Sequence, residues 1–162
     1  MIRMGLAMMA AAAASVTLAA ATAQQPQPPP NHVILPVNEI VWGPAPPSLP
    51  AGAQAAVLYG DPAMEGLFAM RLKVPKGFTI PPHTHPAPEI VTVISGVVRL
   101  GLGSRLDAKS ARPLTAGSFY STEPGTEHYV VVDRDAVLQV NSRGPWGIHY
   151  LNPSDDPRNR NQ

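Results

Sequence analysis

From Ala53 onward, apolar residues fall in short runs separated by Gly, Pro and Asp. Residues two apart on a strand share a face, so short alternating runs of this kind predict strands. The expected strands span residues 55–59, 67–74, 78–85, 90–100, 119–120, 129–132, 136–140 and 146–151. Within the longest run, Ser95-Gly96 predicts a hairpin turn. About ten short strands with frequent turns indicate an all-β sandwich or barrel.

The first 23 residues have the composition of a secretory signal peptide. Arg3 is their only charge, residues 5–21 are apolar and alanine-rich, and Ala21-Thr22-Ala23 is an A-x-A site. A membrane anchor is the alternative, but about 17 apolar residues fall short of the ~20 needed to span a bilayer. We therefore expect cleavage after Ala23, no stable membrane anchor afterwards, and a periplasmic or secreted protein.

The mature chain divides into three further parts. Residues 24–52 are rich in proline, which fixes φ and removes backbone donors, so an extended arm is expected. Two apolar islands, residues 33–35 and 40–42, interrupt the arm. It is either a plain linker or an arm whose islands lie on the barrel of its own chain or of a partner. Residues 53–152 form the single β-domain, and residues 153–162 are read as a polar, solvated tail.

Charge and cysteine content exclude several classes of function. Without the leader, the chain carries 11 basic and 11 acidic residues, so nothing favours a nucleic-acid partner. It has no cysteine, which excludes disulfides, thiolate metal ligands and thiol catalysis. Stability must therefore come from a packed core.

Candidate metal chemistry gathers in two stretches. His83 and His85 are two apart, so their imidazoles can converge from one face of a strand. Glu89 follows after a Pro-x-Pro stretch and can return a carboxylate towards them. His128, placed by a Pro-Gly turn at the head of an apolar strand, can supply a third nitrogen. Imidazoles with a carboxylate suit Zn, Mn, Fe, Ni or Cu better than Ca or Mg.

These stretches resemble the two motifs of the cupin family. The first motif is Gly, five residues, His-x-His, three or four residues, Glu, six residues, Gly, and it matches fully. The second is matched in part, because Pro124 is displaced by one position and Val132 replaces the final Asn. The positions that match are Gly77, His83, His85, Glu89 and Gly96 in the first motif, and Gly117, Gly125 and His128 in the second.

The resemblance implies a jelly-roll cupin barrel, a double-stranded β-helix, and the family often forms homodimers. It also implies a range of functions, from dioxygenases, isomerases, decarboxylases and lyases to storage and sensing proteins. We expect a metalloenzyme acting on a small oxygenated molecule, with His83, His85, Glu89 and His128 as metal ligands. Glu89 can in addition act as a catalytic base. The alternative is a non-catalytic module that binds or senses a metal or small ligand.

Strand alternation also predicts the neighbours of the site. Thr79 should share the face of the first two histidines, Val91 and Val93 that of Glu89, and Val130 and Val132 that of His128. Candidates for the cavity mouth are Phe68, Met70, Phe119, Tyr120 and Trp146. His149, Glu123 and Glu127 are read as packing or solvated residues, and Arg71, Lys73 and Arg99 as facing either a polar substrate or solvent.

Overall fold

The computed structural model describes residues 32–161, and the expected signal peptide lies outside these residues. Residues 33–161 form one compact unit. It contains nine strands and three short 3-10 helices, with no α-helix among the described residues and no helix there long and apolar enough to cross a membrane. The strands are β1 (Gly43–Pro44), β2 (Gln54–Tyr59), β3 (Gly66–Val74), β4 (Thr79–Thr84), β5 (Glu89–Leu102), β6 (Arg112–Thr115), β7 (Phe119–Thr122), β8 (His128–Gly144) and β9 (His149–Tyr150).

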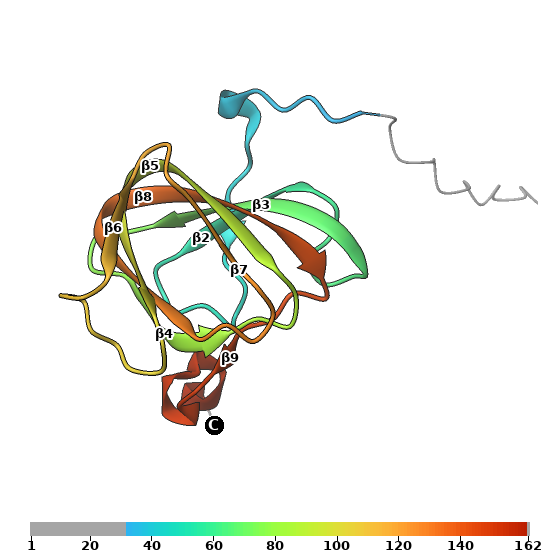
Figure 1. Cartoon of the computed structure of the whole chain (residues 1–162). Coiled ribbons are helices and arrows are strands. Elements are labelled where there is room, and N and C mark those ends of the chain that lie inside the picture. Colours follow the sequence, from blue (N-terminus) through green and yellow to red (C-terminus); the bar gives the residue numbers. More distant parts are fainter. Residues whose placement is uncertain (1–31, 162) are drawn as a thin grey trace, which may run out of the picture. The chain divides into compact units, whose positions relative to one another are not determined.

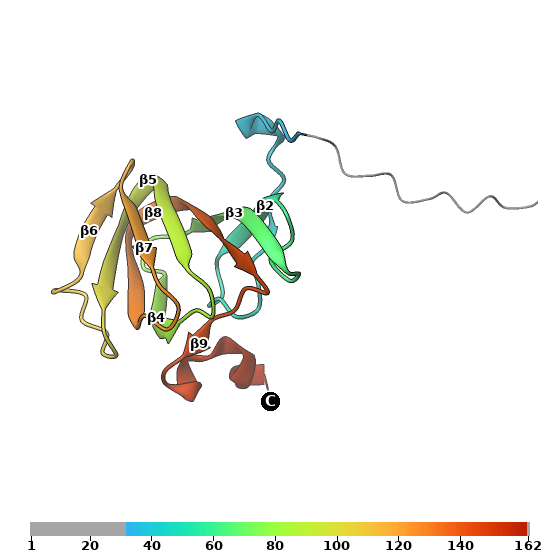
Figure 2. The same ribbon diagram turned by 45° about the vertical axis from the view of Figure 1, so that its right-hand side comes forward.

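All strand pairs are antiparallel. The main path runs β1-β2-β3-β8-β4-β9, and β5 pairs with β6, β7 and β8. The path does not close into a ring, so the fold is a double-stranded β-helix rather than a closed barrel. Figures 1 and 2 show the strands curving around a common interior. That interior is lined by aliphatic and aromatic side chains from most strands, including Met70, Val91, Val93, Val98 and Val140.

The hairpin expected at Ser95-Gly96 is not present. β5 continues through this point as one strand and bends there, where its pairing with β8 shifts register between Val93 and Val98. Gly96 has a φ of +84°, and a Cβ at this position would overlap the backbone of Asp135 and Ala136 on β8. The glycine therefore marks a bend at a close strand crossing, which a turn signal alone cannot distinguish from a hairpin.

Other strand boundaries also differ from the expectation. The runs 129–132 and 136–140 belong to the single strand β8. Between them the strand continues through Arg134, which pairs with Val97 where the register shifts, and Asp133 forms an ion pair with Arg99 at 2.7 Å. The expected strand 146–151 is reduced to β9. The polar tail contains the helices η2 (Pro153–Asp155) and η3 (Pro157–Asn161) and is fastened by Arg158, which donates a hydrogen bond to the Ile148 carbonyl at 3.0 Å.

The described part of the proline-rich arm has two regions that differ in burial. Its first apolar island, residues 33–35, is exposed, as are Val37 in helix η1 (Val37–Glu39) and Val41. The island therefore does not lie on its own barrel. Further along, Trp42 lies under the Lys73 ammonium at 4.1 Å, and Leu49 is buried in the core. The arm is thus joined to the domain only from about Trp42 onward.

Candidate metal centre

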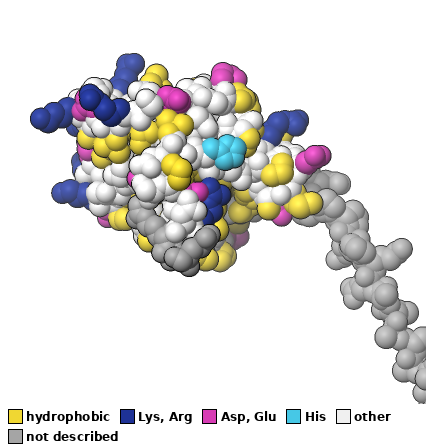
Figure 3. All heavy atoms as spheres, turned by 90° about the horizontal axis from the view of Figure 1, so that it is seen from below, with side chains coloured by type: hydrophobic (Ala, Val, Ile, Leu, Met, Phe, Trp, Pro, Cys, Tyr) yellow, Lys and Arg dark blue, Asp and Glu magenta, His cyan; other side chains and the backbone are white. Residues whose placement is uncertain are grey.

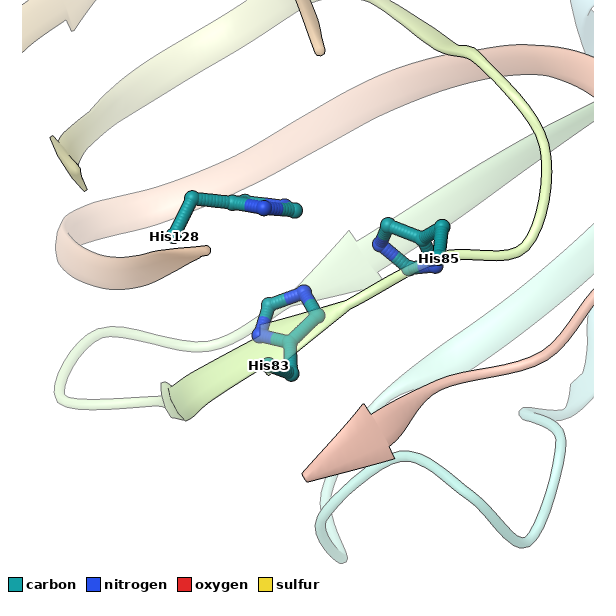
Figure 4. A group of neighbouring side chains, drawn as sticks. All are labelled: His83, His85 and His128. Atoms are coloured by element: carbon teal, nitrogen blue, oxygen red, sulfur yellow. The ribbon is translucent and has the colours of Figure 1, made fainter. Parts of the chain in front are cut away.

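Three histidines from two neighbouring strands face one another inside the domain (Figure 4). His83 lies near the end of β4, His85 follows just beyond it, and His128 is the first residue of β8. The β4–β8 register places His83 directly opposite His128. Glu89, the first residue of β5, brings its carboxylate to the same place, so the structure gathers all four residues that the sequence singled out.

A bulge on β4 changes which neighbours share this face. The register shifts between Ile80 and His83, where Pro81 and Pro82 cannot donate to the ladder. Ile80 therefore points into the interior with the histidines, while Thr79 is only half-buried. The expectation that Thr79 lines the site is wrong for this reason. Val91, Val93, Val130 and Val132 are buried on the expected faces.

Backbone carbonyls orient each ring. The Nδ1 atoms of His83, His85 and His128 lie 2.7, 2.7 and 3.0 Å from the carbonyl oxygens of Pro81, Gly147 and Thr126. A carbonyl only accepts, so each Nδ1 must carry the proton and donate it. Each Nε2 then keeps a lone pair, as in metal-ligating histidines whose second nitrogen is held by a backbone carbonyl.

The Nε2 atoms and the carboxylate converge. Glu89 Oε1 lies 3.4 Å from His85 Nε2, and Glu89 Oε2 lies 3.7 Å from His128 Nε2. One ligand atom from each histidine lies within 4.8 Å of the others. Within the described residues, the buried Nε2 atoms of His85 and His128 have no hydrogen-bond partner. Buried lone pairs left in this way are costly unless a bound group satisfies them.

Burial keeps the His83 and His85 rings neutral. All four side chains belong to residues that are 5% exposed or less. Burial, followed by the nearby His128 and His85 rings, lowers the pKa of His83 to about 3. Burial also lowers the pKa of His85, against the opposing effect of the Glu89 carboxylate. Neutral imidazoles at pH 7 are the form that binds metals.

The cavity beside these groups is small and mostly apolar. Its volume is about 20 Å³, enough for about one water-sized group. Tyr120 and Trp146 are its two polar lining side chains besides the cluster, among the described residues. Burial and the Glu89 carboxylate raise the pKa of Tyr120 well above its usual value, so its phenol stays protonated. The remaining lining residues are Leu49, Leu72, Ile80, Val130, Leu138, Val140 and Ile148.

The donor set fits a divalent transition metal. Three neutral nitrogens and one carboxylate are the ligands that Zn, Fe, Mn, Ni and Cu accept, and the apolar wall excludes water from them. His83, His85, His128 and Glu89 would hold the ion. The donor chemistry does not select one metal from this group. A metal-binding site is thus supported by geometry, while the identity of the metal stays a prediction.

The other candidates divide between the interior and the surface. Phe68 and Met70 lie in the core, Tyr120 and Trp146 line the cavity, and Phe119 is 61% exposed, so it does not contribute to the site. Glu123 and Glu127 are exposed, as expected for solvated residues. Arg71, Lys73 and Arg99 do not line the cavity and make contacts outside it, with Gln139, Trp42 and Asp133 respectively.

His149 is the one exposed histidine within residues 33–161. Figure 3 shows one histidine side chain exposed on the surface seen from below. His149 pairs with Thr84 at the edge of β4, between His83 and His85 in the chain. Its exposure agrees with the interpretation that it is not a ligand.

Sequence reasoning missed two parts of the site. Leu49 comes from the proline-rich arm, where the local pattern gives no sign that a residue returns to the core. The carbonyls that hold the rings were also missed. For His83 and His128 the acceptor lies two residues earlier in the chain, a local relation that the sequence contains, but Gly147 reaches His85 from 62 positions away.

The fold and the histidine cluster together define a double-stranded β-helix protein with the means to bind a metal. Residues 70–140 match the family model described as Cupin domain, and this range contains all four clustered side chains. Over this range the chain resembles a cupin domain, and its fold is the double-stranded β-helix of the cupin structures it matches. No curated protein matches it.

Solved structures agree with this fold. KdgF from Halomonas sp. is 20% identical with a TM-score of 0.54, covering 69% of this chain and 93% of that one. The polyketide cyclase RemF from Streptomyces resistomycificus is 16% identical with a TM-score of 0.61, covering 77% and 89%. An RmlC-like cupin from Shewanella frigidimarina is 17% identical with a TM-score of 0.53, covering 66% and 86%. At these identities the similarity concerns the fold alone.

Proposed function

We propose that this protein is a metal-dependent enzyme acting on a small oxygenated molecule at the His83, His85, His128 and Glu89 centre. The observation that carries the proposal is the convergence of neutral Nε2 lone pairs and one carboxylate in a buried, apolar cavity. A divalent metal bound there would supply Lewis-acid chemistry and open positions for an oxygen ligand. Enediols, β-diketones and catechols are substrates of the matching class.

The chain's own groups have separable roles in this proposal. The carbonyls of Pro81, Gly147 and Thr126 fix the imidazoles. The aliphatic wall limits the cavity to about one water-sized group, and its low polarity strengthens electrostatic interactions there. Glu89 is the one carboxylate in the cavity lining among the described residues, and it is our candidate for accepting a proton from the substrate.

A second function, a non-catalytic metal- or ligand-binding module, is favoured by the size of the cavity. About 20 Å³ holds one water-sized group and not a whole substrate. In that case the metal would serve mainly to stabilise the fold, and its removal would unfold the domain. The enzyme proposal instead requires that an aliphatic side chain of the wall, such as Leu49, moves to admit a substrate.

Water exchange separates the two functions. The chain would be loaded with Mn(II), and the relaxation of bulk water protons measured before and after unfolding of the complex. The enzyme proposal expects strong relaxation from exchangeable water, together with turnover in a screen of enediols, diketones and catechols. Metal binding without exchangeable water and without turnover would favour the binding module. Failure to bind any of the five candidate metals would exclude both.

Location and assembly are further parts of the proposal. The leader-like composition of residues 1–23 supports a periplasmic or secreted protein. The exposed apolar island of residues 33–35 supports a homodimer in which this segment packs on a second copy. N-terminal sequencing of the exported protein and sedimentation of the chain with and without residues 33–41 test these two points.

A further inference from the structure

Trp146 holds a fixed position against the candidate metal centre. Its indole ring stacks on the His85 imidazole, with centroids 5.4 Å apart and planes at 21°. Phe68 packs edge-on against its ring at 6.5 Å. Its backbone N–H donates to the Pro62 carbonyl at 2.7 Å. Contacts with two rings and the backbone therefore fix the direction in which the indole nitrogen points.

The indole N–H is buried and has no acceptor within the described part of the chain. An indole nitrogen donates only, and a buried donor without a partner is destabilising. The ring lines the same small cavity as His83, His85 and Glu89. The other two buried side-chain atoms without a partner are the Nε2 atoms of His85 and His128. An unused donor thus lies beside two unused metal-ligating lone pairs.

We propose that Trp146 Nε1–H is the ligand-recognition donor of this site and binds an oxygen atom of a carboxylate or enolate seated beside the metal. This inference rests on the proposed metal centre. The donor requires an acceptor, which excludes an ammonium group at this position. The centre would carry a net positive charge once three neutral imidazoles and one carboxylate surround a divalent ion, which favours an anionic oxygen over a neutral one. The preferred ligand is therefore a small oxygen anion.

The size of the cavity sets how much of such a ligand fits. The cavity volume of about 20 Å³ admits one water-sized group, which matches a single ligand oxygen. A buried structural water is the competing occupant for the indole N–H. Such a water needs two to four polar partners. Among the described lining residues, the only such groups outside the cluster are Tyr120 and Trp146 itself, so a water would depend on the same centre.

The test uses the Zn-loaded full chain, with formate as the smallest carboxylate and formamide as its neutral counterpart. The chain has two tryptophans, so a Trp42→Phe variant assigns the two indole N–H signals in the NMR spectrum. We expect formate to move the Trp146 signal downfield to saturation and to leave the Trp42 signal in place. Formamide should bind more weakly.

A Trp146→Phe variant keeps an aromatic ring against His85 and removes the donor. Its affinity for formate should fall about tenfold or more, the effect expected for a hydrogen bond to a charged group. Its affinity for Zn should stay within about threefold. Trp42→Phe, the matched control, should change neither. If Trp146→Phe fails to fold, the indole titration of the unmodified chain still decides.

The outcomes separate this inference from the proposed function. Formate binding that leaves the Trp146 signal unmoved, or that is equal in Trp146→Phe, overturns the recognition role while the metal centre stands. A Trp146 signal that is already shifted by a tightly held water and does not respond to formate also overturns it. Absence of binding for Zn and for the other four candidate metals overturns the metal centre itself, and the inference falls with it.

Discussion

His83 and His128 lie directly opposite each other in the β4–β8 pair, with ring centroids 4.2 Å apart. They are 45 residues apart in the chain, so only the antiparallel register brings them together. His85 then joins them through ring distances of 4.9 and 5.2 Å. The site is thus a property of the strand pairing as much as of the motif.

Replacing His83 with alanine should abolish stoichiometric metal binding. The substitution removes one of three convergent nitrogens, and loss of a direct ligand should exceed the about 10–100-fold cost typical of lost outer-sphere partners. Elemental analysis of the purified protein, with a competition titration against a chelator, measures the effect. His149→Ala is the matched control, because His149 is exposed and outside the cluster, and it should bind metal normally. Equal metal content in both variants would contradict the assigned ligand set.

Acid should destabilise the metal-free chain between about pH 6.5 and pH 3. Burial and the neighbouring histidines lower the pKa of His83 from 6.5 to about 3, and burial lowers that of His85 as well. In this window the unfolded chain binds protons that the folded chain does not, so stability falls as the pH falls. Within this window His83 contributes roughly 1.4 kcal/mol per pH unit to the loss, and His85 adds to it in the same direction. Below the folded pKa the effect levels off.

Urea denaturation of the chelator-treated chain at several pH values measures this slope. His83→Gln is the comparison, because glutamine fills the site without titrating. Its free energy of unfolding should depend less steeply on pH between 6 and 4 than that of the parent chain. Parallel curves would show that His83 is protonated in the folded state and that its burial does not have the effect inferred here.

Much of this site could be predicted from the sequence, because the ligands sit in local patterns. His-x-His on a strand fixes two imidazoles on one face whatever surrounds them. The same alternation along a strand predicts interior valines near Glu89 and His128, and these valines are buried. The prediction that Thr79 lines the site is wrong because a bulge on β4 shifts the alternation of side chains by one residue. The pattern of hydrophobic and polar residues does not reveal such a bulge.

The features that the sequence did not predict depend on contacts between distant segments. Gly96 was read as a turn because glycine favours both turns and close crossings, and only the position of β8 decides between them. Leu49 enters the core from a segment whose prolines predict an extended arm. Its place is fixed by the Tyr150 hydroxyl, which donates to the Ser48 carbonyl at 2.8 Å across 102 positions. Such long-range contacts produce no periodic pattern in the sequence.

Gly96→Ala should destabilise the fold more than Gly117→Ala. The two glycines have nearly the same φ, +84° and +86°, so both variants pay a similar backbone cost of about 1–2 kcal/mol. At Gly96 the added methyl also meets Ala136 Cα at 2.6 Å, whereas nothing lies within 4 Å at Gly117. Overpacking adds about 1–3 kcal/mol to the first variant alone. Guanidinium denaturation measures the difference, and equal losses would refute the proposed close crossing.

Leu49→Ala should both weaken the fold and open the metal cavity. Leu49 is 4% exposed, packs in the core cluster and lines the cavity beside the histidines, so its truncation should cost about 2–4 kcal/mol. The shortened side chain also removes part of the wall that separates the centre from the arm. Zn bound to the variant should therefore pass to an added chelator at least about tenfold faster at equal temperature, an estimate based on reduced burial of the ligands.

Leu106→Ala is the control for this prediction, because Leu106 is 41% exposed and lies outside the core cluster. It should change neither the free energy of unfolding nor the rate of metal release. Leu49→Met keeps most of the side-chain volume, so it should cost less than about 1.5 kcal/mol and release metal slowly. A Leu49→Ala variant that loses stability but releases Zn at the parent rate would show that the chelator reaches the centre by another route. Access would then have to be sought beside Tyr120 or Trp146, the two polar side chains of the same wall.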